Sequence, residues 1–380
     1  MQIRDAASAG FLAVALLGIG RIEVARGGDP PVSLQVELPR DYQVVQRRTR
    51  AEGSVPMRGR APAGTERLEA QFGGEWLPVD FKPGDGTYDA SVKVASGGWY
   101  ACRIRALSGD RVLATAEVQH VGVGEIFVVA GQSNSANHGE EQQRTRTGRV
   151  AAFDGVRWQL ANDPQPGASG NGGSFIPPFG DAISDRFKVP VGIVACGIGA
   201  TSVREWLPSG SRFPNPPTIV DRVRQLDSGE WESKGDAFAM LVARMKSVGS
   251  RGFRAVLWHQ GESDANQKDP TRTLRGDLYR RYLEQVICES RRETGWDAPW
   301  FVAQVSYHVP GDEASPEIRA AQKSLWDAGI ALEGPDSDSL KGELRDGGGQ
   351  GVHFSGRGLR EHAARWADKV SPWLEAQLDR

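Results

Sequence analysis

Serine and glycine residues follow an apolar run of this chain in a pattern that suits nucleophilic catalysis. Residues 126–130 lead directly into Gly131-Gln132-Ser133-Asn134-Ser135. A glycine before a serine in a tight turn after a strand exposes the serine hydroxyl, and backbone N–H groups converge beside it as an anion site requires. A Gly turn followed by a Ser or Asn helix cap explains the same residues, so both interpretations stay open at this point.

Two later apolar runs also end in polar or glycine-rich sequence. Residues 191–195 lead into a segment containing Gly199, whose N–H would serve a developing oxyanion, although an ordinary turn fits equally well. This segment has neither GxGxxG spacing nor a Walker lysine, so phosphate binding is disfavoured. Residues 255–258 lead into a polar cluster, His259-Gln260-Gly261-Glu262-Ser263-Asp264.

The polar cluster favours a functional role over a solvated loop, because the run before it is apolar enough to be buried on both faces of a sheet. Gln260 offers amide donors, and Glu262 offers a carboxylate that could orient a histidine. His353, just before the last predicted helix, is the candidate base, with a hydrogen-bonded packing residue as the alternative. Metal-ligand spacing is lacking among the other histidines, so we expect no metal and no cofactor.

Three of these segments, in this order, carry a resemblance to a known family. Residues 128–134, 258–264 and 352–358 resemble the signature blocks of the SGNH (GDSL-like) hydrolase superfamily, and more narrowly its sialate O-acetylesterase and acetylxylan esterase group. The Gly-rich segment ending at Trp206 is similar to that group's second block. The resemblance runs from about Val121 to the C-terminus and implies a three-layer α/β/α domain with a mostly parallel sheet.

The resemblance also implies roles for individual residues. Ser133 would be the nucleophile and His353 the general base, with an oxyanion hole made by the Ser133 N–H, the Gly199 N–H and the Gln260 side chain. Candidates for substrate contact are Asn134, Trp206 and Trp258; for the two tryptophans, core packing is at least as good an interpretation.

The acid of the catalytic triad departs from the family pattern. The superfamily usually places an Asp three residues before the histidine, where this chain has Gln350. An amide can hold a histidine tautomer but cannot stabilise the imidazolium by charge. Glu262 is our first substitute and Asp346, in a Gly-rich loop, the second; a Ser-His dyad or a loss of activity remains open.

These residues predict a metal-independent serine esterase that removes O-acetyl groups from carbohydrates through an acyl-enzyme. The alternative is a non-catalytic carbohydrate-binding or scaffold protein on a decayed esterase fold. A lipase or thioesterase is disfavoured, because the sequence shows no apolar lid or amphipathic flap. The motifs do not separate sialic acid, xylan and other O-acetylated glycans as substrates.

Hydrophobic periodicity supplies the elements that would position these residues. From residue 126 onward, compact apolar runs alternate with helical spacing, which is typical of βα units whose ligands lie beyond the carboxyl ends of the strands. Strands are expected at 126–130, 191–195, 255–258 and 300–305. Helices are expected at 181–187, 219–226, 237–248, 278–292, 317–328 and 356–370, the last with Ser355 as its N-cap.

The segment before this α/β region alternates with period two between turn signals, which predicts a small all-β, Ig-like sandwich domain over residues 31–121. Residues 122–380 would form the esterase domain. Residues 6–20 are small and apolar with Arg4 before them, so residues 1–30 are interpreted as a signal peptide, with a buried or poorly ordered N-terminal segment as the alternative. Secretion or export to the periplasm is therefore expected, with the cytoplasm as the alternative.

The amino-acid composition excludes several classes of protein. With 46 Lys and Arg against 48 Asp and Glu among 380 residues, the charge gives no reason to expect binding to nucleic acid or an anionic membrane. With 39% hydrophobic and 25% charged residues, the chain is globular rather than collagen-like or disordered. The expected partner is an O-acetylated carbohydrate, and the oligomeric state stays open.

Overall fold

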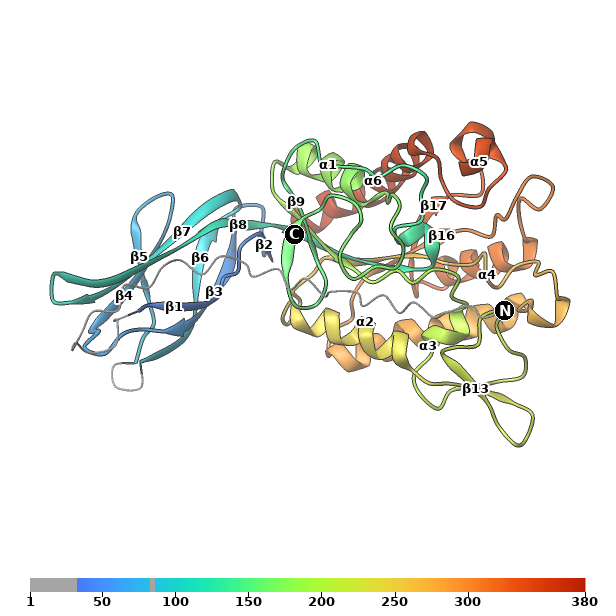
Figure 1. Cartoon of the computed structure of the whole chain (residues 1–380), viewed down its shortest axis with the longest axis horizontal. Coiled ribbons are helices and arrows are strands. Elements are labelled where there is room, and N and C mark those ends of the chain that lie inside the picture. Colours follow the sequence, from blue (N-terminus) through green and yellow to red (C-terminus); the bar gives the residue numbers. More distant parts are fainter. Residues whose placement is uncertain (1–32, 83–85, 380) are drawn as a thin grey trace, which may run out of the picture. The chain divides into compact units, whose positions relative to one another are not determined.

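The computed structural model shows a mixed α/β fold, as the sequence predicts (Figure 1). It describes residues 33–82 and 86–379, so the expected signal peptide lies outside the described residues. Among these residues no helix is both long and apolar enough to cross a membrane.

Strands dominate the first part of the chain, and helices alternate with strands after it. The strands are β1 (Gln35–Leu38), β2 (Gln43–Gln46), β3 (Glu52–Arg60), β4 (Arg67–Phe72), β5 (Trp76–Val79), β6 (Thr87–Ala95), β7 (Gly97–Ser108), β8 (Arg111–Gly131), β9 (Val150–Phe153), β10 (Trp158–Leu160), β11 (Val191–Ala195), β12 (Arg212–Phe213), β13 (Val223–Gln225), β14 (Trp231–Ser233), β15 (Ala255–His259), β16 (Trp300–Gln304) and β17 (Leu332–Asp336). The helices are α1 (Ile176–Phe187), α2 (Asp236–Ser247), α3 (Gly276–Thr294), α4 (Pro316–Asp327), the short turn α5 (Asp346–Gly349) and α6 (Gly356–Leu378).

Strand β8 is continuous over 21 residues and begins well before the strand that the sequence predicted at 126–130. Its first part pairs with β7 and β2, and its second part pairs in parallel with β11 and β15. Gly122 and Gly124 lie within this strand and allow a close approach: a Cβ at Gly124 would lie 1.9 Å from the carbonyl oxygen of Pro190. The expected domain boundary at residues 121 and 122 therefore falls inside β8.

The strands before β8 bury alternate residues around one cluster of apolar side chains. β1, β3 and β6 form an antiparallel sheet, while β4 pairs with β5 and β7. Val55 and Met57 of β3 contribute to the cluster, as do Leu68 of β4 and Ile104 of β7. The strands β2, β3 and β4 were not predicted, because Gly53, Pro56 and Gly59 make β3 look like a loop in the sequence.

The main sheet runs in the order β10-β9-β11-β8-β15-β16-β17, and every pairing from β9 to β17 along it is parallel. Alternate residues of β8 enter the cores on its two faces. Val128 packs in the core that contains Leu241 of α2 and Leu283 of α3. Val129 packs in the core that contains Phe179 of α1 and Trp366 of α6. Helices therefore cover both faces of this sheet (Figure 1).

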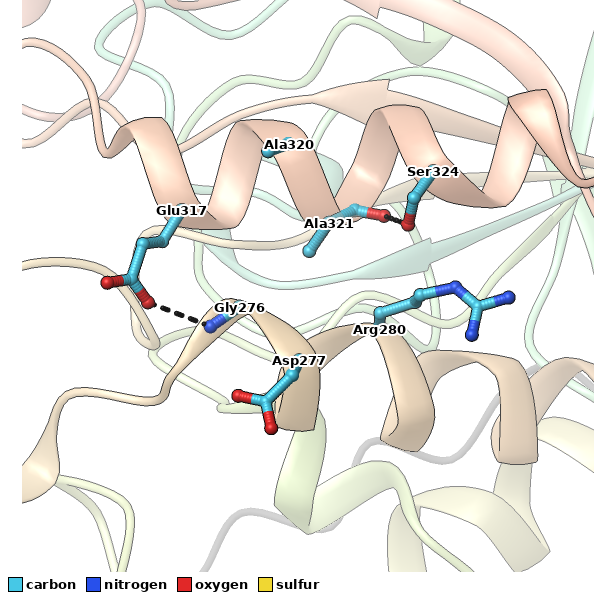
Figure 2. Close-up of a pocket in the computed structure, with 7 residues that line it drawn as sticks. All are labelled: Gly276, Asp277, Arg280, Glu317, Ala320, Ala321 and Ser324. Atoms are coloured by element: carbon cyan, nitrogen blue, oxygen red, sulfur yellow. Dashed lines mark hydrogen bonds between the residues drawn. The ribbon is translucent and has the colours of Figure 1, made fainter.

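Helices α3 and α4 approach each other closely where α3 begins. Figure 2 shows Glu317 of α4 accepting a hydrogen bond from the backbone N–H of Gly276 at 3.0 Å, which satisfies one free donor of the α3 N-terminus. A Cβ at Gly276 would lie 2.6 Å from the Glu317 carbonyl oxygen, so the approach requires glycine. This contact joins the beginnings of α3 and α4, which pack with β15 and β16 in the same core.

Three predicted helices differ from the structure, one of them α6, which ends at Leu378 rather than at residue 370. Residues 219–226 form no helix; they contain β13, which pairs with β14 across a turn in which Gly229 has φ 86°. Helix α1 begins at Ile176 rather than at Asp181, because prolines are tolerated in a first helical turn, where their missing N–H would have no partner. The expected cap of α6 is confirmed: Ser355 accepts a hydrogen bond from the N–H of Gly358.

The buried carboxylate of Glu125 in β8 pairs with two arginines, and this arrangement gives a prediction about stability. Its carboxylate accepts hydrogen bonds at 2.7 Å from Nε of Arg47 and from Nε of Arg254. Glu125→Ala leaves both guanidinium groups without this partner, so the free energy of unfolding should fall by about 3–5 kcal/mol. Chemical denaturation measures this. Glu117→Ala, which removes the exposed partner of Arg103 on the same strand, should have far less effect; equal losses would contradict the prediction.

Candidate active site

The carboxyl ends of β8, β11 and β15 converge on a cavity of about 640 Å³. Ser133 lines it after β8, Gly199 after β11, Glu262 after β15, and His353 just before α6. The structure thus brings together these residues, which the sequence singled out separately. Other lining residues are Gln132, His138, Ser169, Thr218, Arg222, Ser263 and His308.

Hydrogen bonds to both neighbouring strands set the position of Ser133. The N–H of Ile198 donates to the carbonyl of Gly131, and the N–H of Gln132 donates to the carbonyl of His259, both at 2.9 Å. Gly131 has φ 126°, and a Cβ there would lie 2.1 Å from the His259 carbonyl oxygen. Only glycine fits this turn, which directs the chain from β8 into the short helix η1 (Ser133–Ser135) at the cavity.

Asp346 is the carboxylate that lies against His353. Its Oδ2 is 3.5 Å from Nδ1 of His353, and its Oδ1 accepts the backbone N–H of His353 at 3.1 Å. Gly347, Gly348 and Gly349 have φ of 57°, 66° and 91°, and this left-handed run returns the chain so that the two residues meet. A Cβ on Gly351 would lie 1.7 Å from Oδ1 of Asp346, so that glycine leaves the space that the carboxylate fills.

Glu262, our first choice as the triad acid, makes different contacts. Its Oε1 accepts a hydrogen bond from Nδ2 of Asn134 at 2.9 Å and lies 3.9 Å from Nδ1 of His259. The same Asn134 nitrogen donates to the carbonyl of Val352, the residue before His353. Among the described contacts none joins Glu262 to His353. Glu262 thus acts on the His353 segment through Asn134, and the direct partner of the histidine is Asp346.

Burial shifts the pKa of Glu262 and that of His353. Burial raises the pKa of Glu262 from its ordinary 4.5 to about 7, against the hydrogen bond from Asn134, which lowers it. Burial lowers the pKa of His353, while Asp346 acts in the opposite direction. His353 therefore stays in the neutral form, which can accept a proton, to lower pH than an exposed histidine would.

Two of the expected oxyanion donors already have partners in the protein. The N–H of Gly199 donates to Oγ of Ser169 at 2.6 Å. The side-chain nitrogen of Gln260 donates to Oδ2 of Asp264 at 2.7 Å and to the carbonyl of Thr201 at 3.0 Å. Gln260 is fully buried and lies outside the residues that line the cavity.

The expected substrate contacts of Trp206 and Trp258 are replaced by core packing. Both side chains are fully buried, and their rings meet edge to face with centroids 5.3 Å apart. Nε1 of Trp206 donates to Oγ1 of Thr201, so its polar atom is also satisfied internally. Asn134, the other expected contact, is buried and bonds Glu262 and Val352 rather than lining the cavity.

The sequence reasoning missed His138 and Ser169 as residues of the cavity. The His138 ring stacks on that of His353 with centroids 5.5 Å apart, and its Nε2 lies 3.1 Å from Oγ of Ser169. Ser169 lies in a loop 31 residues after His138, and no motif links the two. Only the tertiary structure brings them together.

In this fold Ser133 follows β8, near the centre of the sheet, and His353 precedes the last helix, α6. A model of the family described as carbohydrate esterase, sialic acid-specific acetylesterase, matches residues 123–371. The chain belongs to this family of carboxylic ester hydrolases.

One solved structure supports the fold. A carbohydrate acetylesterase from Xanthomonas citri has a TM-score of 0.53 and 17% identity, over 88% of this chain and 73% of that one. A protein from Arabidopsis thaliana (TM-score 0.44, 18% identity, 65% and 98% covered) and NanS (0.42, 16%, 66% and 98%) are also similar. No curated protein sequence matches significantly.

The raised pKa of Glu262 predicts a pH-dependent effect on stability. Between about pH 4.5 and 7 the folded protein binds a proton at Glu262 that the unfolded chain has released, so this carboxyl destabilises the fold as pH rises. Glu262→Gln keeps an oxygen for Asn134 and removes the titration. Relative to wild type, the variant should gain on the order of 3 kcal/mol in free energy of unfolding between pH 4.5 and 8. Urea denaturation at the two pH values measures this, and a pH-independent difference would contradict it.

Proposed function

We propose that the protein is a serine esterase that removes O-acetyl groups from carbohydrates, with Ser133 as nucleophile, His353 as general base and Asp346 as the triad acid. The observation that carries the proposal is the contact of Asp346 with Nδ1 of His353, in a cavity that Ser133 also lines. Acetate release from O-acetylated sialic acid and from acetylated xylo-oligosaccharides tests the substrate; the family description favours the former.

The reaction divides into acylation and deacylation. His353 takes the proton of the Ser133 hydroxyl as Oγ attacks the acetyl carbonyl carbon, and the carbonyl electron pair moves onto oxygen. When the tetrahedral intermediate collapses, the C–O bond to the sugar breaks and His353 returns the proton to the sugar oxygen. Water then attacks acetyl-Ser133 with His353 again as base, which releases acetate and restores the serine.

Asp346 suits the role of the acid better than Glu262. It lies against the ring nitrogen that does not exchange protons with Ser133, so it fixes the tautomer and stabilises the imidazolium that forms in each step. Glu262 has a pKa near neutrality and a different hydrogen-bond partner. A decayed scaffold would have no need for a carboxylate in this position, which supports the enzyme over the non-catalytic alternative.

The proposal extends to the organisation of the chain. We propose that residues 122–380 form the catalytic domain, with its parallel sheet and helices on both faces, and that residues 31–121 form a β-sandwich. Export to the periplasm or the medium is part of the same proposal, since polymeric O-acetylated glycans lie outside the cell. Fractionation of cells that express the full chain tests the location.

Replacing each of the two candidate acids by its isosteric amide distinguishes between them. Ser133→Ala should abolish hydrolysis of p-nitrophenyl acetate. Asp346→Asn should lower kcat by about 10³–10⁴-fold, because the imidazolium loses its carboxylate. The pKa of His353 should fall as well, which moves the acidic limb of the kcat/KM profile to lower pH.

Glu262→Gln is the matched comparison, and it should cost less than about tenfold in kcat because Asn134 keeps an acceptor. The opposite ranking of the two amides would overturn the assignment of the acid. A wild type that binds acetylated sugars but releases no acetate would favour the non-catalytic alternative.

Gly351 provides a second test of the Asp346 contact. Gly351→Ala places a methyl group where Oδ1 of Asp346 lies, so the carboxylate must move away from His353. The expected loss in kcat is on the order of 10²-fold with KM little changed. Gly74→Ala, which adds its methyl to open space at a glycine without a positive φ, is the control for the substitution itself. Equal activity of the two variants would contradict the contact.

A further inference from the structure

The cavity needs a donor for the oxyanion that the expected residues do not supply in this structure. The Gly199 N–H is bonded to Ser169, and the Gln260 amide nitrogen is bonded to Asp264 and Thr201. The Ser133 N–H remains, and the described contacts give it no acceptor in the protein. An oxyanion in a site of low polarity is best stabilised by more than one donor that is already oriented.

Gln132 has an amide whose orientation the surrounding donors determine. Its Oε1 accepts from the N–H of Ser263 at 3.0 Å, from Nε2 of Gln260 at 3.3 Å and from the N–H of Gly261 at 3.4 Å. All of these partners are N–H groups, so the atom that faces them must be the oxygen. The amide group of Gln132 is therefore held with its nitrogen on the opposite side.

The nitrogen of Gln132 is the end of the side chain that is available to a ligand. Gln132 lines the cavity beside Ser133, although only 3% of the residue is exposed. In the described part of the chain Nε2 has no acceptor, and it is not among the side-chain atoms sealed from solvent without a partner. A rigid, neutral N–H donor therefore stands next to the nucleophile.

We propose that Nε2 of Gln132 donates a hydrogen bond to the oxyanion of the tetrahedral intermediate, together with the N–H of Ser133. This inference rests on the proposed esterase function and changes its oxyanion hole, because Gln132 replaces Gln260 as the side-chain donor. As Oγ of Ser133 bonds to the acetyl carbon, the carbonyl electron pair moves onto oxygen, and Gln132 stabilises that charge without giving up a proton.

Gln260 has a supporting role in this arrangement. It donates to Oε1 of Gln132 and anchors itself on Asp264, so it contributes to the orientation of the Gln132 amide. Gln260 is a positioning residue, whereas Gln132 touches the reacting atoms. The two roles predict different responses when the carbonyl oxygen of the substrate is changed.

The test compares p-nitrophenyl acetate with its thionoacetate analogue, in which sulfur replaces the carbonyl oxygen. Sulfur is a weak hydrogen-bond acceptor, so the preference for the oxygen ester reports the strength of the oxyanion donors. Gln132→Glu keeps an oxygen for the N–H groups of Gly261 and Ser263 and removes the donor. It should lower kcat/KM for the oxygen ester by about 10²–10³-fold and reduce the preference over the thionoester.

Two comparisons make the outcome decisive. Gln260→Met should lower the melting temperature but keep most of the wild-type preference for the oxygen ester, because the N–H groups of Gly261 and Ser263 still hold Oε1 of Gln132. Gln132→Met, which removes the donor without adding a charge, should behave as Gln132→Glu does and serves if the latter fails to fold.

An unchanged preference in the Gln132 variants, or a reduced preference in Gln260→Met alone, would overturn the inference. Failure of the proposed function gives a different result: the wild type would be inactive on both esters, or Ser133→Ala would keep its activity.

Discussion

The site depends on the hydrogen bonds that hold the turn after β8 between its two neighbouring strands. The Gly131 carbonyl accepts from Ile198, and the Gln132 N–H donates to His259. These bonds extend the sheet by one residue beyond the strand ends and leave no space for a side chain at Gly131. Ser133 and the Gln132 amide are thereby fixed by backbone contacts rather than by flexible side chains, which is the condition for oriented catalytic groups.

A second constraint on the site comes from the loop before α6. It concerns where a carboxylate lies in space rather than its position in the sequence. The carboxylate beside His353 comes from a residue seven positions earlier, instead of the usual three, and a run of left-handed glycines absorbs the difference. Gly351 provides the space that this carboxylate occupies. The proposed chemistry requires a charge near Nδ1 of the histidine, and in this chain the longer loop supplies it.

The sequence predicted those features that depend on local pattern. β11 has the expected bounds, and Ser133, Gly199 and His353 meet in one cavity because polar residues at the ends of parallel strands share an edge. Asp346 ranked only second to Glu262 as a candidate acid, since its position beside His353 follows from three consecutive positive φ values that a motif of fixed spacing does not anticipate. Gln132 and Gln260 are equally good donors by type, and only their hydrogen bonds distinguish them. The helix expected at 219–226 does not form, because the stretch with apolar residues at helical spacing is short and a turn follows it.

The continuity of β8 has a consequence for how this protein can evolve. One strand supplies hydrogen bonds to β7 and β2 in its first part and ends two residues before Ser133, and the buried carboxylate of Glu125 ties both parts together. A recombination event that exchanged the N-terminal strands for another module would have to cut and rejoin a strand in the centre of the catalytic sheet. The two parts of the chain are therefore expected to diverge together, as a single evolutionary unit rather than as exchangeable modules.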